Sequence, residues 1–351
     1  MKITIIGAGN GGQAMSGHFS LLGHDVTLYN RDLSKIPDII KKKGVLLKEK
    51  INGFGEVKFI TDDLSKAIKG AELVMIVTTA NAHKDIARKV ASFAEPGQIF
   101  ILNPGRTLGA WEFKKEFYKN TTTRVYIAET QSLIYACRSE GNGEVRIIGI
   151  KEKIPLSALP FTDTSHVLDV INSVYSCFVR AENILETGLE NIGAIFHPPL
   201  VLFNAATIER GETFYFYNDL TPLIAEFLVK LDQERLGIGK AFGFDLLSIS
   251  DWISYSYSGI TGITLCDKMR NNPAYFKILS PTSLESRLIL EDVPTGILPF
   301  IELAQLARIE TPFLKSVFLI LQGMVNRQFE EDGRTLKNLG IENYHTFVSN
   351  L

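Results

Sequence analysis

The chain has 351 residues, of which 45% are apolar and 22% are charged, and its net charge at pH 7 is −2. This length predicts two domains that each bury a core, and the near-neutral charge argues against a nucleic-acid binder, which would carry a basic stripe. No apolar run reaches the roughly 18 residues that a membrane-spanning helix needs, so we expect no membrane partner.

The remaining bulk features point to an intracellular protein. Met1 is followed at once by a strand pattern, so no signal peptide is expected. Cys137, Cys177 and Cys266 are odd in number and far apart, and the six histidines show no metal-ligand spacing. We therefore predict a reduced, cytoplasmic protein without a metal site.

The first elements predict a dinucleotide site. Residues 2–6 read as a short apolar strand, and a helical pattern through Met15 and Phe19 begins about six residues later. Between them stands the sequence Gly7-Ala8-Gly9-Asn10-Gly11-Gly12. Strand, G-x-G-x-x-G and helix in this order form the dinucleotide-binding fingerprint. Gly7 permits the tight turn, Gly9 lets the backbone approach a pyrophosphate, and Gly12 lets the helix pack close to the strand. The phosphates of the dinucleotide then lie over the positive end of the helix.

The end of the second strand, residues 25–29, predicts the choice of cofactor. At this place an acidic residue favours a free ribose 2′-hydroxyl, and an arginine favours a 2′-phosphate. Asn30 and Arg31 stand here, which favours NADP. Asp32 keeps NAD as the alternative, because a shift of one residue would bring its carboxylate to the ribose. The alternative interpretation, in which Arg31 is only a solvated charge in a loop, also stays open.

The first half alternates between strand and helix patterns. Residues 33–43 predict a helix, and residues 45–49 and 56–60 predict a hairpin around an Asn-Gly-Phe-Gly turn. Strands are then predicted at 73–77 and 99–102, which end at Thr78 and Asn103 on the edge where open α/β sheets bind ligands. Residues 124–128 and 145–149 complete a sheet of about six strands. This alternation predicts an α/β fold with a doubly wound parallel Rossmann sheet.

The second half changes to helical spacing from about residue 186. Thr221-Pro222 and Thr311-Pro312 both predict a helix with a threonine N-cap and proline in the first turn. We therefore predict a dinucleotide-binding domain at residues 1–185 and a mainly α-helical domain for substrate and catalysis at residues 186–351.

His197 is the candidate acid–base residue of the second half. It is the one side chain able to carry charge between Glu190 and Glu209, and two prolines follow it. Proline disfavours helical backbone in the residue before it, so we expect His197 at a helix break. A histidine serves as general acid and base near neutral pH. A packed histidine satisfied by a backbone carbonyl is the other interpretation.

Three stretches together resemble the octopine/nopaline (opine) dehydrogenase family. They are the amino-terminal fingerprint, the Asn…Gly-x-x-x-His-Pro segment at residues 191–198, and the Glu-Asp-x-Pro-x-Gly segment at residues 291–296. The resemblance covers essentially the whole chain. It implies a Rossmann domain followed by a helical domain, and an enzyme that joins the amine of an amino acid to a 2-oxo acid and reduces the resulting imine with NAD(P)H.

The resemblance also implies roles for individual residues. His197 and Asp292 correspond to the catalytic pair of the family, and Arg287 corresponds to an arginine close to the oxo-acid carboxylate. Gln131 and Asn191 correspond to residues at the substrates. Asn30-Arg31 differs from the acidic strand end of NAD-using members, so the cofactor preference is not carried over from them.

Other interpretations of these residues stay open. Arg287 is also placed to form a surface ion pair with Glu285 or Glu291, and Asp292 to serve as a turn residue. A related Rossmann reductase of 2-oxo acids would commonly use a lysine as acid and base, but the chain has none between Gly188 and Glu226. A non-catalytic NADP(H)-binding sensor is the alternative from another class. We expect small-molecule partners, an amino acid and a 2-oxo acid, and leave a homodimer open.

Overall fold

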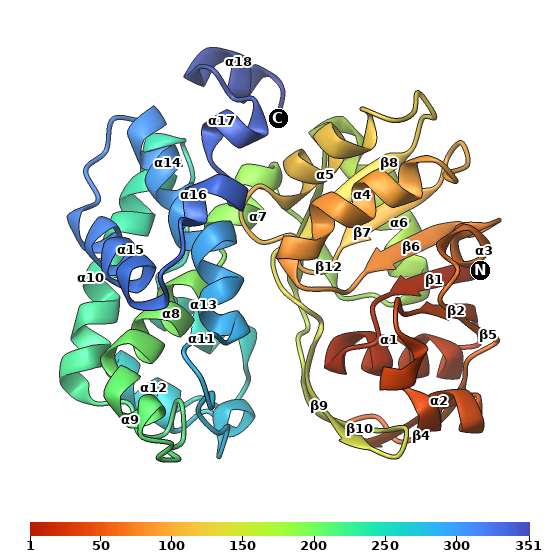
Figure 1. Cartoon of the computed structure of the whole chain (residues 1–351), viewed down its shortest axis with the longest axis horizontal. Coiled ribbons are helices and arrows are strands. Elements are labelled where there is room, and N and C mark those ends of the chain that lie inside the picture. The colour runs from red at the N-terminus through yellow and green to blue at the C-terminus, as the bar shows by residue number, and fades with distance from the viewer. The chain divides into compact units, whose positions relative to one another are not determined.

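The computed structural model describes all 351 residues, and the chain forms two compact units. The first comprises Met1–Thr187 together with Leu351, and the second comprises Gly188–Asn350. Figure 1 shows strands flanked by helices in the first unit and helices throughout the second.

An eight-stranded sheet forms the centre of the first unit. Its strand order is β12-β11-β8-β7-β6-β1-β2-β5, and all neighbours are parallel except β8 and β11. The strands are β1 (Lys2–Ile6), β2 (Asp25–Tyr29), β5 (Phe59–Thr61), β6 (Leu73–Ile76), β7 (Ile99–Leu102), β8 (Tyr126–Thr130), β11 (Ile154–Ala158) and β12 (Phe178–Arg180). The predicted fold class, a Rossmann-type parallel sheet followed by a helical domain, is confirmed, with two strands more than expected.

The central strands are continuous apolar runs because both faces of the sheet are covered. Every residue of β6 and of β7 is buried. The helices of this unit are α1 (Asn10–Leu21), α2 (Pro37–Lys42), α3 (Leu64–Ile68), α4 (His83–Ala91), α5 (Gly109–Phe117), α6 (Thr164–Val174) and α7 (Ile184–Leu189). The helix expected over residues 33–43 is divided into a short 3₁₀ turn at Leu33–Lys35 and α2, because Pro37 begins a new helix.

A second sheet of four strands corrects two predictions. Its order is β4-β3-β10-β9, and its strands are β3 (Gly44–Glu49), β4 (Gly53–Glu56), β9 (Tyr135–Gly141) and β10 (Glu144–Ile150). The strand predicted at 145–149 therefore exists but does not belong to the Rossmann sheet. The predicted hairpin also ends early, since β4 pairs with β3 whereas Phe59–Thr61 joins β2 in the main sheet.

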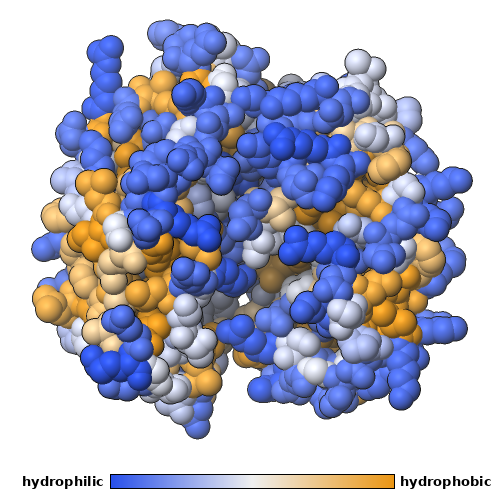
Figure 2. All heavy atoms as spheres, viewed as in Figure 1, coloured by the Kyte–Doolittle hydropathy of each residue, from blue (hydrophilic) through white to orange (hydrophobic).

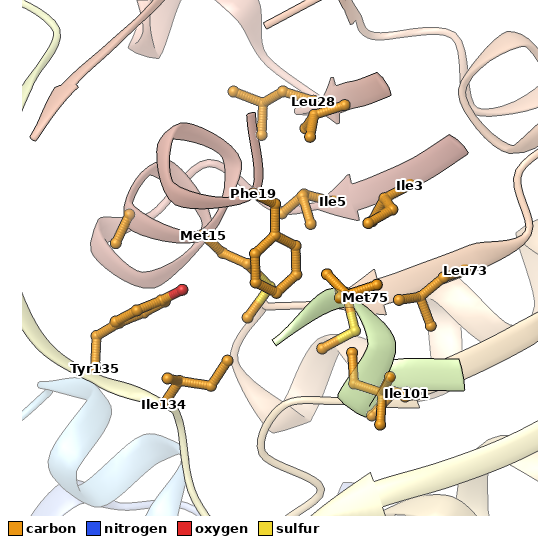
Figure 3. Close-up of a cluster of buried hydrophobic side chains, with 14 of the residues drawn as sticks. Ile3, Ile5, Met15, Phe19, Leu28, Leu73, Met75, Ile101, Ile134 and Tyr135 are labelled. Atoms are coloured by element: carbon orange, nitrogen blue, oxygen red, sulfur yellow. The ribbon is translucent and has the colours of Figure 1, made fainter. Parts of the chain in front are cut away.

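Helix α1 packs against both sheets of the first unit. Met15 and Phe19 on α1 belong to one buried cluster with Ile5 and Met75 of the main sheet, as Figure 3 shows. Val45, Leu47, Val145 and Ile147 of the second sheet belong to the same cluster. The strand 145–149 was predicted from its apolar alternation, and its buried residues do face a core. Both sheets contribute to that core, and the alternation alone does not show to which of the two sheets a strand belongs.

The second unit is mainly helical, with one isolated antiparallel bridge between Tyr215 and Leu279. Its helices are α8 (Gly193–Phe203), α9 (Ala205–Glu209), α10 (Pro222–Ala241), α11 (Ile249–Ser256), α12 (Leu265–Arg270), α13 (Arg287–Leu290), a π-helix (Val293–Ile297), α14 (Leu298–Leu306), α15 (Pro312–Val325), α16 (Phe329–Asp332), α17 (Leu336–Leu339) and α18 (Tyr344–Ser349).

Only one of the two predicted threonine caps forms. Thr221 accepts a hydrogen bond from the backbone N–H of Ile224 and caps α10. Helix α15 begins at Pro312 as predicted, but Thr311 does not cap it. The carboxylate of Glu234 instead accepts from the backbone N–H groups of Phe313 and Leu314, both at 2.8 Å. A negative side chain from α10 therefore satisfies the positive end of α15.

The surface is hydrophilic over most of the face seen in Figure 2, with apolar residues gathered over α10 and α15. The exposed apolar side chains of these two helices are Leu223, Val229, Phe313, Leu319, Ile320 and Met324. No helix combines the length with the apolar character that a passage through a membrane requires.

Candidate functional site

The loop after β1 has room only for glycine at its first position. Gly7 has a φ of +105°, and a Cβ at this residue would lie 2.6 Å from the carbonyl oxygen of Val77. The Gly7 backbone N–H donates to the carbonyl oxygen of Tyr29 at 2.9 Å. The chain therefore turns sharply out of the sheet at the carboxyl ends of β1, β2 and β6.

Gly12 and Gly9 have different roles in the same loop. A Cβ on Gly12 would lie 1.7 Å from the carbonyl oxygen of Gly7, so the close packing of α1 on the loop excludes any side chain there. A Cβ on Gly9 would meet no atom within 4 Å, and the φ of Gly9 is −71°. The fold thus does not require glycine at this position, but a ligand that approaches the backbone would.

The amino-terminal end of α1 is open to an anion. Gly9 is the N-cap residue, and no side chain caps the helix. Asn10 turns its carboxamide oxygen to the backbone N–H of Ser139, at 3.1 Å. The first N–H groups of α1 and the dipole of the helix then favour a phosphate. The residues of this loop fit the pyrophosphate of a dinucleotide.

Asn30 joins the end of β2 to the glycine loop. Its Oδ1 accepts from the backbone N–H of Ala8 at 3.3 Å, and its Nδ2 donates to the carbonyl oxygen of Asp32 at 2.7 Å. The Asp32 carboxylate accepts from the backbone N–H and the hydroxyl of Ser34, and these bonds lower the pKa of Asp32. Arg31 is exposed beside it. Asp32 is therefore engaged in capping a 3₁₀ turn, whereas the guanidinium of Arg31 faces solvent.

Three polar atoms at the carboxyl ends of the central strands are buried without a hydrogen-bond partner. They are Oγ1 of Thr78 after β6, Oδ1 of Asn103 after β7, and Oγ of Ser132 after β8. A buried polar group without a partner costs roughly 1–3 kcal/mol, so three at one edge of a sheet mark a place for a polar ligand. Thr78 and Asn103 are the residues that the sequence predicts at the cofactor. Their polar atoms fit a dinucleotide that binds at the glycine loop and continues along this edge of the sheet.

The segment after β8 also contains Gln131, which is buried, and its backbone N–H donates to the carbonyl oxygen of Pro155. Nearby lies Lys151, a buried amine that the sequence does not single out. Its Nζ donates to the carbonyl oxygen of Leu133 at 2.8 Å, and burial lowers the pKa of Lys151 to about 8. The side chain of Leu133 covers Gly11 at the start of α1.

In the second unit, His197 is hydrogen-bonded through both ring nitrogens. Nδ1 lies 2.7 Å from Oδ2 of Asp292, and Nε2 lies 3.0 Å from the hydroxyl of Tyr217. The side chain of Asp292 is 1% exposed and that of His197 is 16% exposed. A carboxylate can only accept, so Nδ1 carries the hydrogen, and in the neutral ring Nε2 accepts from Tyr217. The structure thus brings His197 and Asp292 together and adds a tyrosine.

The expected helix break at His197 is wrong. Helix α8 continues through Pro198 and Pro199, with His197 in its middle. Each proline removes a backbone hydrogen bond at a cost of about 3 kcal/mol. The flanking residues Ile195, Phe196, Leu200 and Val201 are buried against neighbouring helices, and this packing overrides the local preference. The helix consequently holds His197 on a rigid element.

A π-helix positions Asp292. Asp292 is the N-cap of the π-helix Val293–Ile297, which packs against α8. A Cβ on Gly296 would lie 2.5 Å from Cβ of Ala194 and 3.0 Å from Nδ2 of Asn191. The glycine of the Glu-Asp-x-Pro-x-Gly segment thus allows close packing on the start of α8. Asn191 is buried at this contact.

Arg287 precedes Asp292 by five residues in the chain. It begins α13, its side chain is 63% exposed, and its Nη1 lies 3.8 Å from Oε2 of Glu291. This is the ion pair that the sequence offered as the alternative role of Arg287. The pair is loose and solvated at the arginine end, so it contributes little to stability, and the guanidinium remains accessible.

A glycine-rich loop that leads from a strand of a parallel sheet into a helix is the dinucleotide-binding arrangement, and a histidine–carboxylate pair is able to serve as general acid and base. Fold and site together are those expected of an NAD(P)-dependent dehydrogenase. Residues 180–325 match the family model described as NAD/NADP octopine/nopaline dehydrogenase, alpha-helical domain. Residues 2–107 match the model described as NAD-dependent glycerol-3-phosphate dehydrogenase N-terminus.

Known proteins define the family. The chain is 36% identical over 341 residues to an opine dehydrogenase of Arthrobacter sp. (strain 1C). The aligned region covers 96% of this chain and 94% of that enzyme. The chain also has the fold of octopine dehydrogenase solved with NADH and L-arginine, with a TM-score of 0.83, 19% identity and coverage of 100% and 98%. A yersinopine dehydrogenase solved with bound NADP⁺ gives a TM-score of 0.71, 12% identity and 97% coverage of both chains.

The chain belongs to the octopine/nopaline (opine) dehydrogenase family. It is an NAD(P)-dependent dehydrogenase that acts on the C–N bond of secondary amines, by reductive condensation of an amino acid with a 2-oxo acid. The family resemblance and the reaction expected from the sequence are thereby confirmed.

The two glycines of the loop predict separable effects. Gly12→Ala forces a Cβ against the Gly7 backbone and should lower the free energy of unfolding by about 1–3 kcal/mol or more. Gly9→Ala meets no atom of the protein, so its thermal unfolding should match the wild type while its affinity for NADPH falls. Thermal unfolding and NADPH fluorescence titration measure the two effects. Unchanged NADPH affinity in Gly9→Ala would show that the loop is not the pyrophosphate site.

Proposed function

We propose that residues 1–185 bind NADPH and that His197 and Asp292, in residues 186–351, form the acid–base pair of the condensation. The observation that carries this assignment is the 2.7 Å hydrogen bond between Nδ1 of His197 and the buried carboxylate of Asp292. The carboxylate fixes the tautomer and stabilises the imidazolium once it forms. Nε2 is then the nitrogen that exchanges protons.

The condensation needs a proton at one defined step. The amine of the amino acid adds to the carbonyl carbon of the 2-oxo acid, and the hydroxyl of this adduct must leave as water. The His197 imidazolium supplies the proton to the leaving oxygen, and Asp292 holds the ring and balances its charge. When bound, NAD(P)H supplies the hydride that reduces the imine carbon. In the reverse direction neutral His197 takes up the proton.

Arg287, Asn191 and Gln131 are our candidates for substrate contacts. The exposed guanidinium of Arg287 is able to bind a planar carboxylate through two parallel hydrogen bonds, in exchange for its loose contact with Glu291. Octopine dehydrogenase has been solved with NADH and pyruvate, and this supports a small 2-oxo acid such as pyruvate as one substrate. Asn191 and Gln131 are buried polar side chains in their respective units.

NADPH is the cofactor that the strand end favours. Arg31 is exposed at the end of β2, and Asp32 is held by Ser34. We also infer a cytoplasmic location, supported by three cysteines that form no disulfide. The homodimer stays a prediction.

The reaction is tested with pooled substrates. NADPH oxidation is followed with a mixture of amino acids plus pyruvate, and with each component omitted in turn. We expect turnover only when both are present. Turnover without amino acids would indicate a 2-oxo-acid reductase, and no turnover with any mixture of amino acids and 2-oxo acids would favour a cofactor-binding sensor.

The acid–base pair predicts losses that do not add. His197→Ala, Asp292→Ala and the double variant should all fall to a similar low turnover, about 10²–10⁴ below wild type, because removing either residue disables the shared proton transfer. NADPH binding, measured by fluorescence, should stay near wild type.

The matched control is Glu291→Ala, next to Asp292 in the chain, which should be mild. An essential Glu291 with a dispensable Asp292 would move the carboxylate role by one residue. If His197→Ala only lowers the melting temperature and keeps its turnover per folded molecule, His197 is a packed residue and the proposed chemistry is wrong.

The cofactor preference rests on Arg31. Arg31→Ala should raise the KM for NADPH by about 10- to 150-fold, the equivalent of a charge-assisted hydrogen bond worth about 1.5–3 kcal/mol, and leave the KM for NADH nearly unchanged. Lys35→Ala, which removes another exposed cation close by, controls for the general loss of charge. Equal effects of Arg31→Ala on both cofactors would contradict the assignment.

A further inference from the structure

Tyr217 occupies the ring nitrogen that the proposed chemistry needs. Its hydroxyl lies 3.0 Å from Nε2 of His197, while Asp292 takes Nδ1. Both nitrogens are therefore engaged, so the histidine reaches a substrate oxygen either through this hydroxyl or only after the tyrosine moves away.

The surroundings of Tyr217 hold it in place. Its ring stacks on Tyr275 with centroids 4.2 Å apart and an interplanar angle of 22°, and it meets Phe216 edge-on at 5.0 Å. The backbone on its amino-terminal side is fixed by hydrogen bonds from Phe216 N–H to Ile278 O and from Ser280 N–H to Phe214 O, at 2.7 and 2.9 Å. Tyr217 is 8% exposed. A movement of this side chain would break the stacking, so passage through the hydroxyl is favoured.

We propose that Tyr217 is the third member of the acid–base unit and passes the proton between Nε2 of His197 and the substrate oxygen. This inference rests on the proposed role of His197. In neutral His197 the Tyr217 hydroxyl donates to Nε2. In the imidazolium, Nε2–H donates to the phenolic oxygen, and the phenolic O–H is then the donor to the substrate oxygen.

The proton balance closes over these groups. The leaving hydroxyl of the amine adduct takes the phenolic hydrogen, and the phenolic oxygen takes the hydrogen of Nε2. The carbon–oxygen bond breaks, water leaves, and the positive charge of the imidazolium is transferred to the iminium product. His197 ends neutral and Tyr217 ends unchanged, so no tyrosinate accumulates. The reverse reaction follows the same path backwards.

The test is Tyr217→Phe, which removes the hydroxyl and keeps the stacked ring. We expect kcat to fall by about 10²-fold or more, with both substrate KM values and the melting temperature near wild type, and with a changed solvent deuterium isotope effect on kcat. The double variant with His197→Ala should be no slower than His197→Ala alone. The matched control is Tyr215→Phe, which removes a hydroxyl from an exposed tyrosine two residues earlier. This variant should keep wild-type kcat.

The outcomes separate this inference from the assignment of His197. Wild-type kcat and isotope effect in Tyr217→Phe, with His197→Ala inactive, would overturn the relay and leave the acid–base pair intact. A raised kcat would also overturn it, since Tyr217 would then block Nε2. An active His197→Ala would instead overturn the pair itself.

Discussion

The close contact between helix α1 and the loop before it is the constraint on which the first unit depends. With Gly12 lying against the Gly7 carbonyl, α1 starts directly at the edge of the main sheet. The same helix is buried between two sheets, and Gly17 on α1 touches Val45 and Leu47 of the second sheet. Packing on both sides leaves the helix little freedom to shift. Its uncapped amino-terminal end is thereby fixed at the carboxyl edge of β1, which is what a pyrophosphate site requires.

The second unit likewise holds two side chains, His197 and Asp292, in a fixed position. An imidazole and a buried carboxylate must meet within hydrogen-bond distance, and each stands on a rigid helical element. The π-helix Val293–Ile297 packs on α8 through Gly296. Two consecutive prolines in α8 are tolerated because the helix around them is buried. The buried apolar side chains around the prolines offset the cost in backbone hydrogen bonds, and the helix holds a histidine whose ring is hydrogen-bonded through both nitrogens.

Much of this architecture could be predicted where the local sequence determines it. The glycine loop, the strands 25–29 and 99–102 and the Thr221 cap depend on a few adjacent residues. The predictions failed where distant residues decide. The strand 145–149 was assigned to the wrong sheet, since its partner β3 lies about 100 residues earlier. Thr311 does not cap α15 because Glu234 on another helix does.

In the site, too, some residues could be predicted from the sequence and others could not. The family motif predicted His197 and Asp292, and the structure places them in contact, while Arg287 has the exposed position and the Glu291 contact that the sequence left open. Tyr217 was missed because nothing in the run from Phe214 to Tyr217 distinguishes a histidine partner from core aromatics. Lys151 was missed because its burial depends on how β10 and β11 are connected.

The reaction requires that hydride is delivered to an imine that both substrates form together. The most direct measurement uses NADPH deuterated at both C4 positions, with the amino acid and 2-oxo acid found by the pooled assay, and determines the product mass. Reduction of a shared imine predicts a secondary amine that contains the carbon skeletons of both substrates and one deuterium, at the former carbonyl carbon. Deuterium in a 2-hydroxy acid, with the amino acid unconsumed, would contradict it.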